Sequence, residues 1–472
     1  MMGLYGTLNL GTRAIQTQSQ GLAVAGQNLA NVNNPAYSRQ RLLVQTSATL
    51  PTTLGPQGTG VGAVGIQRLY NSLVDRQIQG ETTVSGFWSA QQNALQYAQT
   101  NLGEALNSRA LDTSASGVVS AQSSLASELS GLFNEFHNLA ASPASLSQRG
   151  VLLNKAQSLA AQFNQTDDRL ASLNHSLNDS VTSDVGKAAE TLKSVASLNE
   201  QIRRAELGAS GSANDLRDLR QQKLESLAGL TNVETAEDAD GQVNVSIGGN
   251  LLVSGQQVLA NLETYAAGNG QQLVRTTTGT NLTLTGGSIA GTIDARDGAL
   301  ATVRRNLDTL AATLATEVNT VHAGGFNLAG GQGTDFFTGN SAATIKVNAA
   351  LVSNPSLLQA SGNATAVGDN QTALALATLA DKPIAALGGQ TISGAYAGVV
   401  TSLGQSLSTA NSQVEEQQLV QDMLLSQRSS VSGVSIDEEM TDLVKYQKAF
   451  QASARIISTV DEMLNEVINM KR

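Results

Sequence analysis

The sequence has no cysteine among its 472 residues. This absence excludes disulfide bonds, thiolate nucleophiles and cysteine-ligated zinc sites. Apolar runs all fall short of the roughly 18 residues that a membrane-spanning helix needs, so we expect no membrane partner. The first residues also lack the basic and continuous apolar segments of a secretory signal peptide, so we expect any export to proceed without a cleaved signal.

Motifs of enzyme chemistry are also missing. The chain contains neither the HExxH pattern of zinc proteases nor the GxSxG turn of serine hydrolases. A GxGxxG match at 60–65 has no clear helix start after it, which argues against a dinucleotide site. His137, His175 and His322 lie far apart in helical sequence, and we interpret them as surface or interface residues. We predict no enzyme activity, no catalytic residue, no cofactor and no metal site.

Aromatic residues make up only 3% of the chain, and Asp and Glu outnumber Lys and Arg by 38 to 28. The resulting net charge of −10 argues against a nucleic-acid partner. The sign is uneven along the chain, because the first carboxylate is Asp75 and the charged residues before it are Arg13, Arg39, Arg41 and Arg68. Pairing between this positive N-terminal arm and the acidic C-terminal segment is mildly favourable.

The first 34 residues predict an amphipathic helix. Apolar residues recur at spacings built from three and four, at Leu4, Leu8, Ile15, Leu22, Ala25, Leu29 and Val32. Gly11 falls on the same stripe and is expected to weaken it, because glycine lowers helix stability by about 1 kcal/mol. Pro35 ends the element.

Residues 72–230 are predicted to be largely helical. Two stripes at helical spacing support this: Leu152, Ala156, Leu159, Phe163, Leu170, Leu173 and Leu177, then Leu192, Val195, Asn199 and Ile202. Alternating apolar residues at 243–247, and again at 280–285 before Gly286-Gly287, indicate strands and hairpins over 231–295. Helix is predicted to return at 298–322 and at about 396–430, with irregular sequence between.

The last segment carries the strongest helical pattern. Neither glycine nor proline occurs after Ile436, and Ser435 and Glu438 have the spacing of a capping box. A helix over these residues is about 50 Å long and needs a partner helix for its apolar seam. A strict alternation of four and three predicts that this seam consists of Ile436, Met440, Leu443, Gln447, Phe450, Ala454, Ile457, Asp461, Leu464 and Ile468.

These patterns predict an α+β fold. Long terminal helices pair as a coiled coil, mainly helical arms form the middle, and a small β domain is inserted mid-chain. We assign 1–34 and 435–472 to the terminal helical domain, 35–230 and 296–434 to the middle domain, and 231–295 to the β domain.

The stretch after the first helix, NLANVNNPAYSRQ, resembles the N-terminal signature of flagellar axial proteins, the rod, hook and hook-associated families. Asn28, Asn31, Tyr37 and Arg39 occupy the characteristic positions of that signature. Ala36 stands where glycine is common in these families, and a turn that needs positive φ would strain an alanine there.

Further segments are similar to the hook-associated family of the hook–filament junction. They occur in the family's order at 58–78, 214–234, 321–337 and 432–472, and read GTGVGAVGIQRLYNSLVDRQI, NDLRDLRQQKLESLAGLTNVE, VHAGGFNLAGGQGTDFF and SGVSIDEEM onward. Larger relatives carry a further β domain after the Phe-Phe pair. The short stretch after Phe336-Phe337 therefore implies a smaller outward-facing part.

The resemblance implies a structural protein that joins hook to filament as a homo-oligomeric ring, assembled through its terminal helices. It also implies hook subunits, an adjacent hook-associated protein and flagellin as partners, an export chaperone on the C-terminal helix, and an extracellular place in the flagellum. The assembly interface predicted on this basis consists of Leu8, Ile15, Leu22, Leu29, Asn28, Asn31, Tyr37, Arg39, Leu443, Phe450, Ile457 and Leu464.

Two alternatives remain open. Another axial protein, such as the hook subunit or a distal rod subunit, would share both ends of the chain. A secreted coiled-coil adhesin would also carry long helices, but it need not have the asparagine signature.

Overall fold

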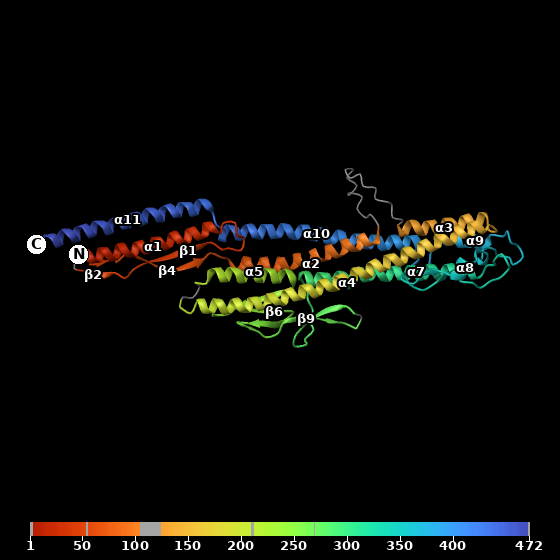
Figure 1. Cartoon of the computed structure of the whole chain (residues 1–472), viewed down its shortest axis with the longest axis horizontal. Helices are drawn as coiled ribbons and strands as arrows, with labels where there is room; N and C mark the ends of the chain where they lie inside the picture. The colour runs from red at the N-terminus through yellow and green to blue at the C-terminus, as the bar shows by residue number, and fades with distance from the viewer. Residues whose placement is uncertain (1–2, 53–54, 104–123, 209–211, 269, 471–472) are drawn as a thin grey trace.

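The computed structural model describes residues 3–52, 55–103, 124–208, 212–268 and 270–470. Figure 1 shows an elongated molecule with both chain termini at the same end. At that end α1 (Leu4–Ala30) and α11 (Ile436–Asn469) pack along each other. The predicted α+β fold with paired terminal helices is confirmed.

A β-ribbon accompanies the terminal helices. Strands β1 (Gln40–Thr46) and β4 (Val61–Arg68) pair antiparallel and lie against α1, with a bulge between Leu43 and Val44. Strands β2 (Leu50–Thr52) and β3 (Gly55–Gln57) pair with each other, and both lie between β1 and β4 in the sequence.

Long helices form the body of the rod: α2 (Ser72–Leu102), α3 (Leu125–Ala141), α4 (Leu146–Ala205), α5 (Asn214–Leu230) and α10 (Ile392–Ser432). All residues of the two predicted stripes on α4 are buried. The first stripe packs into a core shared with α3, α7 and α10, and the second packs against the β layer. One continuous helix of 60 residues therefore supports two separate cores.

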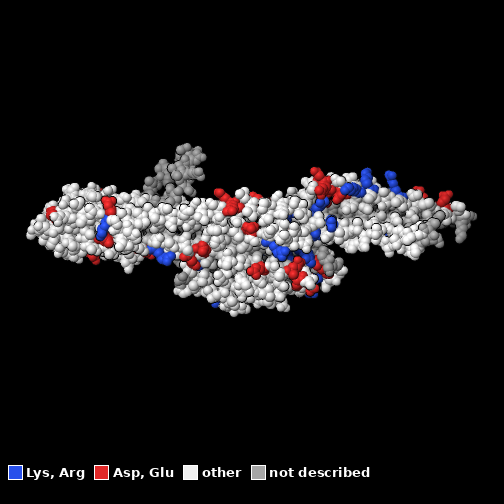
Figure 2. All heavy atoms as spheres, turned by 180° about the vertical axis from the view of Figure 1, so that it is seen from behind, with Lys and Arg blue, Asp and Glu red and all other residues white. Residues whose placement is uncertain are grey.

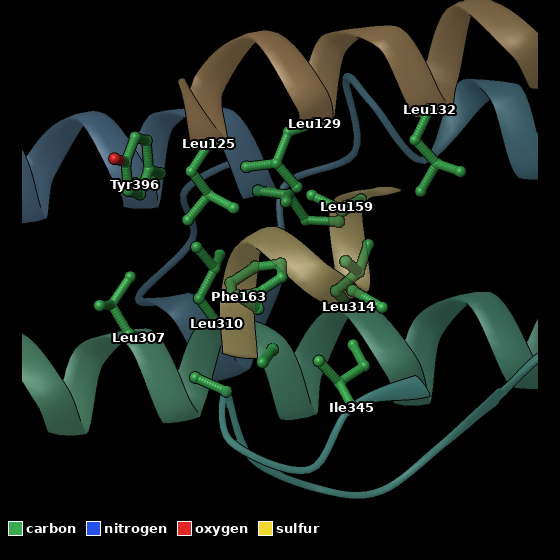
Figure 3. Close-up of a cluster of buried hydrophobic side chains, with 14 of the residues drawn as sticks. Leu125, Leu129, Leu132, Leu159, Phe163, Leu307, Leu310, Leu314, Ile345 and Tyr396 are labelled. Atoms are coloured by element: carbon green, nitrogen blue, oxygen red, sulfur yellow. The ribbon is translucent and has the colours of Figure 1, made fainter. Parts of the chain in front are cut away.

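The larger core lies at the end of the rod far from the termini. Figure 3 shows leucines of α3, α4 and α7 pointing toward one another, with Phe163, Ile345 and Tyr396 among them. The elements around it are α7 (Ala301–Ala323), β11 (Phe337–Thr338), β12 (Lys346–Val347), α8 (Ala349–Ser353), η3 (Pro355–Leu357), α9 (Gln371–Thr378) and η4 (Ala385–Leu387). His322 is fully buried here, so its interpretation as a surface or interface residue is wrong.

The predicted β layer lies on α4 (Figure 1). Its antiparallel sheet has the order β5 (Val233–Glu237), β6 (Val243–Ile247), β7 (Asn250–Ser254), β8 (Gln257–Val258), followed by the hairpin of β9 (Leu262–Ala266) and β10 (Gln272–Thr276). Val243, Val245 and Ile247 are buried, as their alternation predicts. Asn199 of α4 anchors the sheet, because its amide donates to the carbonyl oxygens of Val243 and Gly255.

The second hairpin signal is only partly borne out, because the chain turns back on β10 for a few residues without forming a strand. Residues 280–285, all within the described part of the chain, contribute one bridge between Asn281 and Arg275 instead of a strand. Helix then begins with α6 (Gly287–Asp294) and continues through the π-helical turn η2 (Ala295–Leu300) into α7, earlier than the predicted start at 298. Gly287 has φ of +80°, and a Cβ there would lie 2.2 Å from the backbone nitrogen of Thr231. The glycine pair thus permits a close backbone crossing.

Candidate assembly interface

The contact between α1 and α11 is built on small residues. The side chain of Ile457 packs against Gly11, and a Cβ added at Gly11 would lie 2.8 Å from Ile457 Cγ1. Gly21 receives the ring of Tyr446, with 2.5 Å between an added Cβ and the ring. Gly11 therefore does not weaken the pairing in the predicted way, because both glycines form notches that let the helices approach closely.

The predicted heptad seam coincides with this contact at Ile457 and otherwise lies beside it. The buried residues of α11 are Glu439, Ser453 and Val460. At about 100° per residue, Ser453 and Val460 lie roughly a quarter turn from the centre of the seam, and Glu439 lies nearer to it. Leu22 and Phe450 are 41% and 40% exposed. The other predicted residues of the two helices are half-buried: Leu8, Ile15, Leu29, Leu443, Ile457 and Leu464.

Asn28 is the centre of a buried polar network at the base of the helix pair. Its side chain is 1% exposed. Its amide nitrogen donates to the carbonyl oxygen of Gln40 at 2.8 Å and to Glu439 Oε2 at 3.0 Å. Its amide oxygen accepts from the Tyr37 hydroxyl at 2.8 Å and from the Gln40 backbone N–H at 3.0 Å. Because all donors and acceptors of this amide are used, substitution by any other residue leaves buried polar groups unpaired.

Arg39 fastens the start of α11 to this network. Its Nε lies 2.7 Å from Glu439 Oε1, and its NH1 pairs with Glu438. Its backbone N–H donates to the carbonyl oxygen of Ser432, just before α11. Ser435 is the N-cap of α11, but its side chain makes no capping hydrogen bond. The predicted capping box is therefore not formed, and Glu438 instead pairs with Arg39.

A second set of contacts ties the same segment to α5. Asp218 accepts from the backbone N–H and hydroxyl of Ser38, at 2.9 and 2.8 Å, and pairs with Arg68 at 2.7 Å. Asp215 accepts from the side-chain amides of Gln40 at 2.8 Å and Gln27 at 3.2 Å. We call this whole network the joint, and it consists of Asn28, Tyr37, Ser38, Arg39, Gln40, Arg68, Asp215, Asp218, Glu438 and Glu439. It connects α1, the ribbon, α5 and α11.

Asn31 and Ala36 play smaller parts. The Asn31 amide donates to the carbonyl oxygen of Gln27 at the end of α1, so it acts locally as a helix stop. Ala36 does not have positive φ, since no residue other than glycine does in the described chain. The expected strain at this position is therefore absent.

The joint keeps its groups in defined protonation states. Burial raises the pKa of Tyr37 well above its usual range, and the charges of Asp215, Asp218 and Glu439 act in the same direction. The hydroxyl therefore stays protonated and can donate to Asn28. Burial lowers the pKa of Arg39, but its hydrogen bond to Glu438 and the charges of both glutamates outweigh burial, so the pKa is raised.

The sequence signature identified Asn28, Tyr37 and Arg39, and the structure brings these three together. It did not identify their partners Asp215, Asp218 and Glu439, which lie far away along the chain. A possible signal is the spacing of Asp215 and Asp218, which places both carboxylates on one face of a helix. On the face shown in Figure 2, charged side chains gather most densely where the terminal helices meet the rod.

Two family models match separate parts of the chain. A family model described as the flagellar hook-associated protein FlgK helical domain matches residues 116–337. A model of the flagellar basal body rod FlgEFG protein C-terminal region matches residues 425–470. The chain is 26% identical to flagellar hook-associated protein 1 of Bacillus subtilis (strain 168), with 99% of each chain aligned. The resemblance to the flagellar hook-associated proteins is confirmed.

Other hook-associated relatives agree. Flagellar hook-associated protein 1 of Escherichia coli (strain K12) is 23% identical, with 98% of this chain and 99% of that protein aligned. The alignments extend over 523 and 563 positions, so these relatives carry insertions relative to the 472 residues of this chain. The solved structure of the flagellar hook junction protein FlgK from Burkholderia pseudomallei shares the fold, with a TM-score of 0.65, 16% identity, and 75% of this chain and 100% of that chain covered.

These relatives support a structural, hook-associated role in the flagellum for this chain. Among the described residues, every helix lacks the combination of length and hydropathy required to span a membrane. The role of the joint is mechanical, since it fixes the terminal helix pair to the rod through paired polar groups, of which Asn28, Asp218 and Glu439 are buried.

Proposed function

We propose that the chain forms the junction between hook and filament, as a ring of copies whose terminal helices line an inner tube. Its proposed neighbours are hook subunits on one side, and the adjacent hook-associated protein and flagellin on the other. In this proposal the protein acts outside the cell and performs no catalysis.

The joint is the observation that carries this proposal. A closed ring or tube requires every copy to present its inner and outer parts at the same angle. Asn28 and Arg39 fix α11 to α1, and Asp218 fixes the same segment to α5. The proposed terminal domain, 1–34 and 435–472, is thereby held at a defined orientation to the proposed middle domain, 35–230 and 296–434. The β domain, 231–295, then faces the outer wall.

The predicted heptad seam supports assembly through the terminal helices. Apart from Ile457, its residues flank the contact within the chain, and Phe450 and Leu22 remain exposed. These apolar side chains are available to neighbouring copies in the ring. Before assembly, the same surface of α11 is the proposed site of an export chaperone.

The first test uses cells that lack the gene. We expect filament subunits to be shed into the medium while hooks stay intact, and the wild-type chain to restore attached filaments. Arg39→Glu is expected to reduce attached filaments strongly, because it places a third carboxylate beside Glu438 and Glu439. Combining Arg39→Glu with Glu439→Arg should recover part of the loss. Arg305→Glu, on the exposed surface of α7, is the matched control and should behave as wild type.

Other outcomes distinguish the alternatives. Loss of hooks together with filaments would identify a hook or rod subunit. Normal filaments with a defect in surface attachment would identify an adhesin. If Arg39→Glu restored attached filaments to the wild-type level, the joint would not be required for assembly.

A further inference from the structure

The β1–β4 ribbon, which lies against α1, exposes apolar side chains. Val64 is 65% exposed and Val44 is 55% exposed, and Ile66, which is paired with Leu42 on the same face as Val44, is also open to solvent. We call these three residues the ribbon patch. Helix α1 packs along the ribbon, and α5 contacts it at its base through Gln40, Arg68 and the backbone of Ile66. A two-stranded ribbon with so little cover is marginal in water, so the assembled state should cover the patch.

A second apolar surface lies on α11. Ile436, Met440, Val444 and Phe450 are each 40% exposed or more, and we call them the outer stripe. Figure 1 shows α11 and the ribbon on opposite sides of α1. One chain therefore cannot close its own ribbon patch onto its own outer stripe, whereas two neighbouring chains can.

The charges of the two surfaces are complementary. The first 74 residues carry no carboxylate, and Arg13 and Arg41 are exposed there, with Arg41 bonded to the neutral side chain of Gln67. Helix α11 carries seven carboxylates against three cations, and Asp437 is exposed beside the outer stripe. Within one chain, Arg39 already pairs with the acidic start of α11. The same attraction is available between copies.

We propose that the ribbon patch of one copy packs on the outer stripe of α11 of the next copy. This inference rests on the proposed self-assembly and specifies which surfaces meet. The two surfaces differ, so the contact is heterologous and repeats from copy to copy, which produces a ring or a helical tube and not a closed pair.

Crosslinking in assembled flagella tests the contact, because the chain has no cysteine of its own. Val64→Cys and Val444→Cys are expressed separately, together in one cell, or combined in one chain, and treated with a short bismaleimide. We expect no product from either single variant, a dimer from the mixture, and a ladder of multimers from the double variant. Val64→Cys with Val367→Cys, which is exposed at the far end of the rod, is the control pair and should give no product.

Attached filaments without these crosslinks would overturn the contact and leave the proposed function standing. If the cysteine variants do not assemble, the contact is tested instead by comparing how well Val64→Asp and Val64→Ile are incorporated into flagella. We expect incorporation of Val64→Asp to fall about tenfold, because a buried unpaired carboxylate is costly, and Val64→Ile to stay near wild type. Equal incorporation of both variants, or loss of both, contradicts the contact. Far-UV circular dichroism of the purified chains confirms that each variant is folded.

Discussion

His322 is a fully buried residue at the far end of the rod, and both of its ring nitrogens are hydrogen-bonded. Its Nδ1 lies 2.7 Å from the carbonyl oxygen of Thr334, and its Nε2 accepts from the Gln359 backbone N–H at 2.9 Å. An acceptor nitrogen requires the neutral ring. Burial lowers the pKa of His322 to about 4, although the hydrogen bond to Thr334 and the charge of Asp335 act in the opposite direction.

We therefore expect stability to fall in mild acid. His322 binds a proton at about pH 6.5 in the unfolded chain and only near pH 4 in the folded chain. The contribution of the neutral His322 ring to the free energy of unfolding is therefore complete above pH 6.5. It falls by roughly 3 kcal/mol as the pH drops between these values. Thermal unfolding measured from pH 7.5 to pH 4 checks this. His322→Gln should be less stable at pH 7 and should show a shallower slope, whereas the exposed His137→Gln should match wild type.

At the residue scale, the sequence identified one half of the joint. The signature residues Asn28, Tyr37 and Arg39 lie close together in the chain and follow a helix end, so a local pattern is enough to find them. Their partners lie up to 411 residues away along the chain, and only folding brings them together. Glu438 shows the limit of local rules, because its spacing suits a capping box and Arg39 pairs with it instead.

At the scale of elements, periodicity predicted α4 well and the terminal contact poorly. The stripes of α4 consist of large apolar residues that fill a core. The contact between α1 and α11 depends on Gly11, Gly21 and Ser453, whose value lies in their small size. A pattern of hydrophobic residues does not reveal contacts made by such small residues, so the predicted seam meets the true contact at Ile457 and otherwise lies on its flank.

The notch at Gly21 gives a matched pair of substitutions. Gly21→Ala places a methyl group against the Tyr446 ring, whereas a Cβ at Gly26 meets no atom within 4 Å. We expect Gly21→Ala to loosen α11, and Gly26→Ala to stabilise α1 by about 1 kcal/mol through helix propensity. Amide hydrogen exchange of residues 440–460 reports the difference.

Rescue completes this comparison. Tyr446→Ala in the Gly21→Ala background removes the clash and should return exchange toward the level of Tyr446→Ala alone. Equal exchange in Gly21→Ala and Gly26→Ala would show that the notch has no role in pairing.

On the scale of the whole molecule, the terminal helix pair and the body of the rod differ in the share of their residues that is buried. Helix α11 has three buried residues among 34, whereas α4 has 22 among 60. The joint contacts α11 only at its start, and the rest of the helix packs against α1 through Tyr446, Ile457 and their neighbours. A long helix with so little cover depends on further partners for its order.

This asymmetry predicts that the terminal pair opens independently of the rod. In a dilute, monomeric sample, amides at 447–465 should exchange far faster than those at 152–202, and the amides next to the joint at 439–443 should lie between. In assembled flagella the same α11 amides should become protected, since neighbouring copies cover the helix. Strong protection of 447–465 in the monomer, unchanged on dilution, would mean that α1 alone completes the fold of α11. The terminal helices would then need no neighbours to become ordered.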